Sequence, residues 1–169
     1  KVISGTPAYS PPELFDAETF QFIGRKKIDG ETLNREAIDC FGVGATLAEV
    51  VTGNKLVPKK EESSADTYYA VKALAGISRE DLDILCAAAV TDPLFEKKAE
   101  NALMKGSPDT PGHIVNHLTR NVLMPLKHHP EVFQASMGLM VGKEGQPGLP
   151  GMRLTVEQAA QRMATALSQ

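Results

Sequence analysis

The chain of 169 residues contains no tryptophan, two cysteines and few aromatic residues, which make up 5% of the sequence. Two cysteines cannot form a disulfide-rich scaffold. Cys40 and Cys86 both lie in apolar helical patterns, which is typical of buried free thiols in a reducing compartment. No apolar run is long enough to cross a bilayer as a helix. These absences predict a cytoplasmic protein without a membrane partner.

The chain also lacks a strong charge of either sign. Its formal net charge is −3 and its isoelectric point is near 5.8, so we expect neither a nucleic-acid partner nor a polybasic membrane contact. Apolar residues make up 42% of the sequence and charged residues 23%, which is typical of a globular protein with a core. The composition therefore favours a folded domain with a core.

The hydrophobic pattern predicts a mainly α fold, because no segment shows convincing strand-like alternation. Residues 36–53 are apolar on nearly every side of a helix, apart from Thr46 and Glu49, so we expect a central helix that is buried all round. Gly53 would end this helix, and Asp39 would cap its N-terminus. Proline pairs, capping residues and apolar spacing predict further helices at 14–22, 78–89, 94–104, 114–123, from Pro130 and from Thr155. Ser78 would cap the second of these, and Thr155 and Gln158 would form a capping box at the start of the last one. The apolar residues of that last helix should face inward: Val156, Ala159, Met163 and Leu167.

Three sequence motifs occur in a fixed order. Residues 5–13 read GTPAYSPPE, residues 39–44 read DCFGVG, and residues 152–159 read MRLTVEQA. They resemble the Gly-Thr-x-x-Tyr-x-Ala-Pro-Glu, Asp-x-Trp-x-x-Gly and Arg-x-Thr-x-x-(Gln/Glu)-Ala motifs of eukaryotic-like Ser/Thr protein kinases. Pro11 replaces the alanine of the first motif, and Phe41 replaces the tryptophan of the second.

This resemblance implies a divergent, helical C-terminal lobe of the protein-kinase-like fold. Residues 1–14 would be the end of the activation segment and the substrate loop, 36–53 the central helix, and 152–169 the arginine and the final helix. The N-lobe and the catalytic loop would precede Lys1 in a longer polypeptide. Residues 54–151 exceed the length usual for the family, so we expect an elaborated helical region there that could bind a protein partner.

The resemblance also implies roles for the first motif. The Thr6 hydroxyl would bond to the catalytic-loop Asp and Lys, while Gly5, Pro7 and Tyr9 would shape the substrate-binding pocket. Thr6 favours Ser/Thr substrates over tyrosine. Ser4 and Thr6 are candidate phosphorylation sites.

Four further residues would act structurally. Glu13 and Arg153, which are 140 positions apart, would form a buried ion pair, because a guanidinium can grip a carboxylate through two hydrogen bonds. By the same resemblance, Asp39 would accept backbone N–H bonds from the catalytic loop, and Phe41 would take the tryptophan's place in the core. None of the four would be catalytic.

We expect no metal site within the chain. His113 and His117 are spaced to share a helix face, but no further ligand pattern completes a site, so surface or interface histidines are favoured. The glycines from Gly142 to Gly151 lack the Lys-Ser/Thr ending of a phosphate loop.

The leading interpretation is therefore the substrate-side portion of a Ser/Thr protein kinase. ATP and Mg²⁺ would bind the full-length kinase, whereas this portion alone would bind neither and would not turn over ATP, because the residues that hold them precede Lys1 in the family. The alternatives are a pseudokinase or kinase-like interaction scaffold, and an unrelated helical adaptor. A secreted effector would act in the host cytoplasm.

Overall fold

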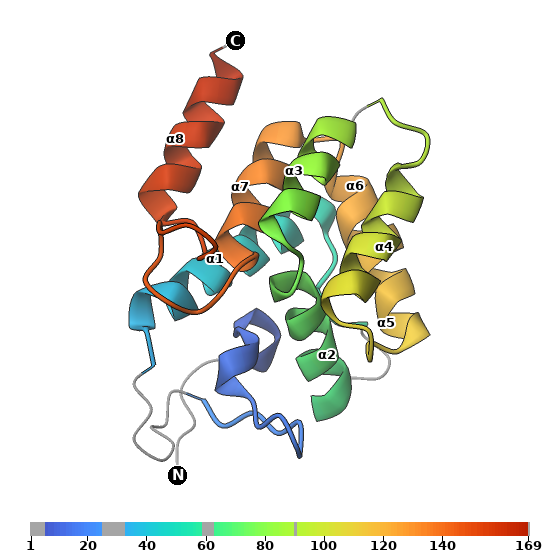
Figure 1. Ribbon diagram of the computed structural model, residues 1–169, viewed down its shortest axis with the longest axis vertical. Coiled ribbons are helices and arrows are strands. Elements are labelled where there is room, and N and C mark those ends of the chain that lie inside the picture. The colour runs from blue at the N-terminus through green and yellow to red at the C-terminus, as the bar shows by residue number, and fades with distance from the viewer. Residues whose placement is uncertain (1–5, 25–32, 59–62, 90, 169) are drawn as a thin grey trace.

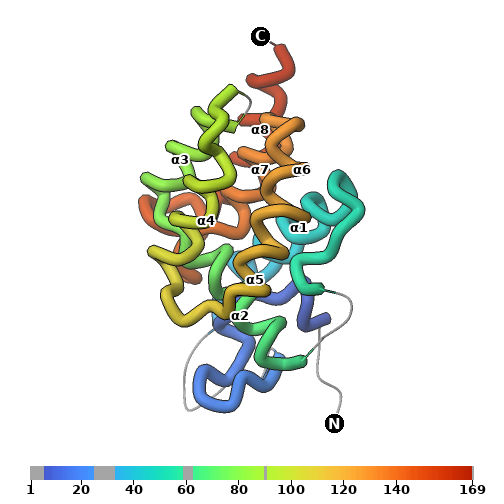
Figure 2. The backbone as a smooth tube through the Cα atoms, turned by 90° about the vertical axis from the view of Figure 1, so that its right-hand side faces the viewer, coloured from blue at the N-terminus to red at the C-terminus, as the bar shows by residue number. Residues whose placement is uncertain are grey.

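A computed structural model describes residues 6–24, 33–58, 63–89 and 91–168 of the chain. Within these ranges the protein is mainly helical and has no β-strands, which confirms the predicted fold class at this level. The N-terminal segment lies at one end of the long axis and α8 at the other (Figures 1 and 2). The α-helices are α1 (Arg35–Thr52), α2 (Ser64–Ala75), α3 (Arg79–Ala88), α4 (Phe95–Gly106), α5 (Gly112–His117), α6 (Met124–Leu126), α7 (Pro130–Met140) and α8 (Val156–Leu167).

Helix α1 has a different cap and a more exposed surface than the sequence predicts. Its N-cap is Asn34, whose side chain accepts a 3.0 Å hydrogen bond from the Ala37 amide, so the prediction that Asp39 caps the helix is wrong. Gly53 ends the helix in the left-handed conformation, as expected. The expectation of burial on all sides is also wrong, because Val43 is 43% exposed and Val50 is 75% exposed.

Helices α1, α7 and α8 pack in succession, and two glycines allow the close contacts. A Cβ on Gly44 would lie 2.7 Å from the Ser136 carbonyl oxygen of α7. A Cβ on Gly138 would lie 2.4 Å from the Leu154 side chain, just before α8. Gly44 is needed for α1 and α7 to meet, because its close neighbour is backbone, whereas a side chain at position 138 would require the Leu154 side chain to move.

Helix α8 begins with the predicted capping box between Thr155 and Gln158. Ala159 is buried and Met163 is partly buried, but Val156 and Leu167 are exposed. The expectation that all four apolar residues face inward is therefore wrong for the first and last of them. α8 projects from the body of the molecule and packs mainly on α7 (Figure 1).

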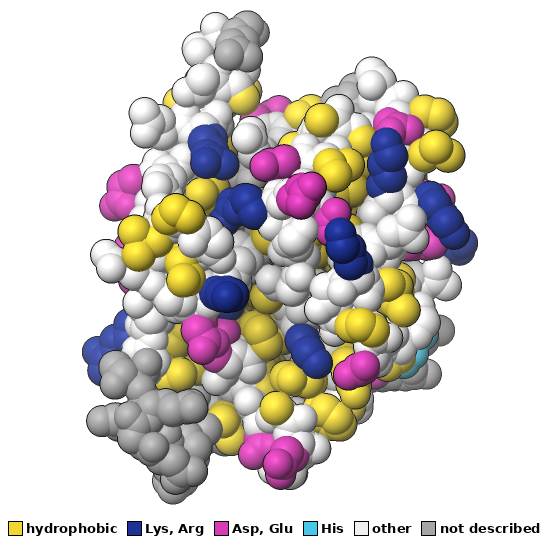
Figure 3. Space-filling view, viewed as in Figure 1, with side chains coloured by type: hydrophobic (Ala, Val, Ile, Leu, Met, Phe, Trp, Pro, Cys, Tyr) yellow, Lys and Arg dark blue, Asp and Glu magenta, His cyan; other side chains and the backbone are white. Residues whose placement is uncertain are grey.

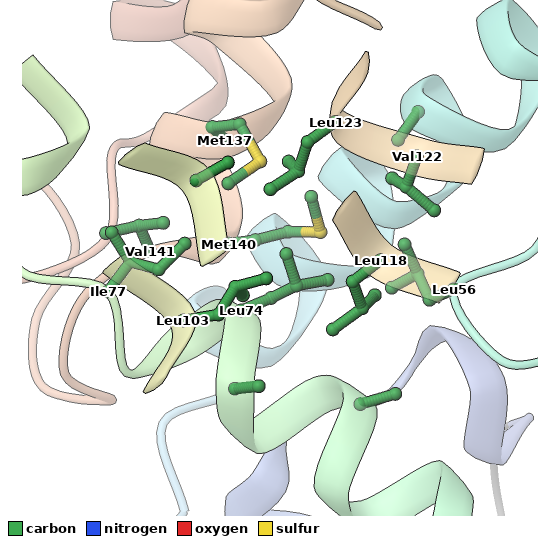
Figure 4. Packing of buried hydrophobic residues seen from close by; sticks show 14 of the residues in the cluster. Leu56, Leu74, Ile77, Leu103, Leu118, Val122, Leu123, Met137, Met140 and Val141 are labelled. Atoms are coloured by element: carbon green, nitrogen blue, oxygen red, sulfur yellow. The ribbon is translucent and has the colours of Figure 1, made fainter. Parts of the chain in front are cut away.

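The predicted elaborated region contains α2 to α7, which surround the largest part of the core. Helix α2 was not expected from the sequence. Side chains from α2, α4, the segment after α5, and α7 converge at the core centre (Figure 4). The residues labelled there are Leu56, Leu74, Ile77, Leu103, Leu118, Val122, Leu123, Met137, Met140 and Val141.

A proline explains an irregular helix in this region. Leu118–Leu123 is π-helical and continues through α6, so Pro125 does not stop the helix. Because proline has no amide hydrogen, it cannot bond to the carbonyl of Asn121 four residues earlier. That carbonyl instead accepts a 3.0 Å hydrogen bond from the Asn54 side chain, which ties the end of α1 to this segment.

The N-terminal segment is less helical than predicted. Prolines open two 3-10 turns, Pro7–Tyr9 and Pro12–Leu14, but the expected helix over 14–22 is absent. Phe15 and Phe22 instead form an isolated antiparallel bridge, and their rings lie 5.3 Å apart. Aromatic packing against α2 therefore replaces the predicted amphipathic helix.

The sequence predicts two free thiols and no membrane-spanning helix. Cys40 and Cys86 are free thiols, as expected, but only Cys40 is fully buried and Cys86 is partly buried. Across the described ranges, no helix has the length and apolarity that a membrane span requires.

Candidate functional site

The 3-10 turn Pro7–Tyr9 lies against one face of α1 and forms the edge of a groove. Tyr9 and Ser10 close the turn, since the Tyr9 amide donates to the Thr6 carbonyl at 3.0 Å and the Ser10 hydroxyl donates to it at 2.8 Å. Thr6 itself is exposed, and its side chain makes no capping bond to the turn. The Thr6 side chain is thus presented at the groove.

The groove has a volume of about 680 Å³ and an apolar floor formed by α1. Its lining combines the turn with one face of the helix: Thr6, Tyr9, Ser10, Leu14, Ile38, Asp39, Gly42, Val43, Thr46, Leu47 and Val50. The exposed valines of α1 are therefore the floor of this groove. The structure brings three predicted site residues, Thr6, Tyr9 and Asp39, to a single surface.

Tyr9 is fixed to the helix by a residue that the sequence analysis did not select. Its phenol donates a short hydrogen bond to the Glu49 carboxylate, and this bond, with burial, raises the pKa of Tyr9. A signal for Glu49 was present in the sequence, because Asp39, Gly42, Thr46 and Glu49 recur at three- and four-residue spacing and therefore share one helix face. The apolar pattern around them masked that polar face.

Glu13 and Arg153 form the ion pair that the resemblance predicts. The two terminal nitrogens of Arg153 donate to the two carboxylate oxygens of Glu13 at 2.5 and 2.8 Å. One of them also donates to the Ala37 carbonyl at 3.1 Å, so the pair anchors the first turn of α1. Side-chain exposure is 1% for Arg153 and 7% for Glu13, so this is a buried, bidentate pair.

Phe41 completes this anchor. Its ring is fully buried, and the Arg153 guanidinium carbon lies 5.3 Å from the ring centre. A desolvated guanidinium over an aromatic face gains cation–π stabilisation. The structure therefore gives Phe41 a defined structural contact, in agreement with its predicted structural role.

Two predicted residues lie outside the described part of the chain. Gly5 and the candidate phosphorylation site Ser4 precede Thr6, where the description begins. Pro7, the remaining member of the predicted pocket, is exposed and opens the first 3-10 turn.

The two histidines contact different segments. His113 lies 3.1 Å from the Asp66 carboxylate, and His117 lies 2.8 Å from the Lys55 carbonyl oxygen. Among the described residues, no group of three or more His, Cys, Asp or Glu side chains is placed to hold a metal ion. On the face in Figure 3, basic and acidic side chains are interspersed and form no single-sign patch.

Comparison with known proteins identifies no relative: no family model, curated protein or solved structure matches the chain significantly. The function is therefore inferred from the groove, the Glu13–Arg153 pair and the sequence motifs.

Proposed function

We propose that this chain is the substrate-side portion of a Ser/Thr protein kinase, with the helical C-lobe of the protein-kinase-like fold, and that its turn Pro7–Tyr9 helps to bind the protein substrate. The observation that carries the proposal is the bidentate Glu13–Arg153 pair. The kinase resemblance requires this contact across 140 positions, and two unrelated surface charges would seldom meet with both residues buried.

The groove supports the same proposal. In the resembled family, the catalytic loop lies between the substrate loop and the central helix. Here, an apolar groove with Thr6 and Asp39 on its lining lies between the Pro7–Tyr9 turn and α1. Exposed apolar floor residues such as Val50 gain stability when another segment covers them. The preceding N-lobe and catalytic loop are the occupants that the proposal requires.

The proposed chemistry divides between this chain and the preceding polypeptide. The preceding residues would hold ATP and Mg²⁺ and supply the Asp that accepts the substrate hydroxyl proton. The residues of this chain would position the protein substrate through Thr6 and Tyr9. Glu49 would hold Tyr9 in place, and Glu13–Arg153 would anchor the loop.

A phosphate-transfer assay on the full-length protein tests this proposal. The wild-type protein should transfer radiolabelled phosphate from ATP to serine or threonine in casein or histone used as probe substrates. Thr6→Ala should lower the rate about tenfold or more, because a hydrogen bond to a charged group is worth about 1.5–3 kcal/mol. The matched control is Thr19→Ala, an exposed threonine that does not line the groove.

The alternative is a pseudokinase or interaction scaffold, which the divergent Pro11 and Phe41 and the long region 54–151 favour. Full-length protein that lacks the upstream catalytic and magnesium-binding Asp residues, and that transfers no phosphate, would support the scaffold. Equal rates for wild type and Thr6→Ala would contradict the proposed role of the turn even in an active kinase.

A further inference from the structure

The loop between α7 and α8 carries Arg153. Two hydrogen bonds connect this loop to the turn between α2 and α3, in the elaborated helical region. The Gly142 amide at the start of the loop donates to the Ala75 carbonyl, at the end of α2, at 3.1 Å. The Met152 carbonyl near its end accepts a 2.5 Å hydrogen bond from the Arg79 guanidinium, at the start of α3. Both contacts come from the turn that joins α2 to α3, residues 75–79. Figure 1 shows this loop below α8.

The loop is closed tightly between those two points. Gly142 has a φ of 121°, which L side chains rarely adopt, and a Cβ there would lie 2.8 Å from the Met152 carbonyl carbon. The Lys143 amide also donates to the Gly151 carbonyl at 3.0 Å. The loop ends therefore lie side by side, and a shift of the Met152 carbonyl would move Arg153, the next residue.

The surroundings of Arg79 partly disfavour a positive charge. This residue occupies the first position of α3, where the helix dipole disfavours a positive charge. Burial, followed by the nearby Arg162, lowers the pKa of Arg79, whereas the nearby Asp83 acts in the opposite direction. The hydrogen bond to the Met152 carbonyl offsets part of this cost, because a charged donor forms a strong bond to a carbonyl oxygen.

The same turn is also packed against α4. A Cβ on Gly106, the last residue of α4, would lie 2.1 Å from the Gly76 carbonyl oxygen. Backbone contact this close leaves no room for movement of one segment without the other. A continuous series of contacts thus runs from α4 through the α2–α3 turn and Arg79 to Met152, Arg153 and Glu13.

We infer that Arg79 is a positioning residue, which holds the Arg153 loop and thereby couples the elaborated region 54–151 to the segment Thr6–Glu13. The inference rests on the proposed function only in identifying that segment as a substrate loop. A partner that shifts the α2–α3 turn would then alter the substrate loop without touching it.

Hydrogen exchange of the chain itself tests the coupling. Arg79→Gln removes the charged donor and shortens the side chain. The amides of Leu14, Phe15 and Leu154, which donate to Pro11, Pro12 and Gly138 carbonyls, should exchange about tenfold faster. Core amides such as Phe133 should keep their rates. Arg79→Lys, which retains a donor of similar reach, should restore part of the protection.

Arg162→Gln is the matched control, because it removes a neighbouring arginine that lines a different groove between α7 and α8. It should leave the Leu14, Phe15 and Leu154 amides unchanged. In a double-mutant cycle, Arg79→Gln and Glu13→Gln should be non-additive at these amides, since both act through Arg153.

The Arg153 Nε–H resonance supplies a spectroscopic signature. This atom is buried and makes no hydrogen bond within the described part of the chain, so its shift reports the position of the guanidinium. Arg79→Gln should move it and Arg162→Gln should not. Three outcomes would overturn the inference. Exchange could rise uniformly at all amides, Arg79→Gln and Arg162→Gln could change exchange rates equally, or the Arg153 Nε–H resonance could stay unmoved in Arg79→Gln. Absence of phosphate transfer would instead contradict the proposed function and leave these readouts intact.

Discussion

The Arg153 guanidinium donates hydrogen bonds to both carboxylate oxygens of Glu13, although the two residues are 140 positions apart in the chain. Both side chains are buried. The contact joins the turn at the start of the described chain to the approach of its last helix. Because Arg153 also donates to the Ala37 carbonyl and lies over Phe41, the pair joins the Glu13 turn and the approach to α8 to α1.

Glu13→Gln should destabilise the protein by about 3–5 kcal/mol, because it leaves a buried guanidinium without its counter-charge. Urea unfolding followed by circular dichroism measures the loss. Glu18→Gln, on an exposed residue of the following loop, is the control and should change stability by less than about 0.5 kcal/mol. A similar small change for Glu13→Gln would show that the pair does not stabilise the fold.

Gly106→Ala should lower stability by about 1–3 kcal/mol, because its Cβ would overlap the Gly76 carbonyl and force two helix ends apart. Gly112→Ala is the matched control, since no atom lies within 4 Å of its Cβ position. That control should be neutral or stabilising by up to about 1 kcal/mol from helix propensity. Thermal unfolding of both variants checks the difference, and equal melting temperatures would contradict the close contact.

Thr119→Val should be neutral or stabilising by about 1 kcal/mol. The Thr119 hydroxyl is fully buried and has no hydrogen-bond partner among the described residues, so a methyl group of similar shape removes an unsatisfied polar group.

The same change at Thr110 should be destabilising by about 1 kcal/mol, because the Thr110 hydroxyl donates to the Ser107 carbonyl at 2.8 Å. Chemical denaturation of the two valine variants gives the comparison. A loss of stability in Thr119→Val equal to that in Thr110→Val would mean that the Thr119 hydroxyl is satisfied.

Cys86 should make stability fall as pH rises from about 9 to about 11. Burial, followed by the nearby Asp83, raises the pKa of Cys86 from 9.0 to about 11. The unfolded thiol therefore loses its proton first, and the stabilisation present below pH 9 is lost as pH rises through the folded pKa. Cys86→Ser should show a weaker pH dependence in urea unfolding at pH 8, 9.5 and 11. Identical pH profiles would refute the shift.

Local signals predicted several elements of this fold well. The Ser78 cap, the Thr155–Gln158 capping box, Pro130 at the start of α7 and the left-handed Gly53 all appear as expected, because each depends on backbone groups within a few residues. The Glu13–Arg153 contact was predicted as well, but only through family resemblance.

Other features were missed because they depend on distant partners. Apolar periodicity predicts a helix over 14–22, yet the Phe15 ring packs on Phe22 and on Tyr68 of α2, and residues 16–20 form a turn. Val43 and Val50 look like core residues in sequence, but no described segment covers them. Glu49 became part of the site only when the turn brought Tyr9 to it.

The sequence by itself determined where most helices begin and where Gly53 ends α1, because capping and proline geometry are local properties. It also contains the motifs that resemble a kinase lobe, which are recognised by their spacing. Only the tertiary structure decided which apolar side of α1 is buried and which is open. It also decided that Arg79 holds the loop of Arg153, because such contacts arise from the packing of segments far apart in the chain.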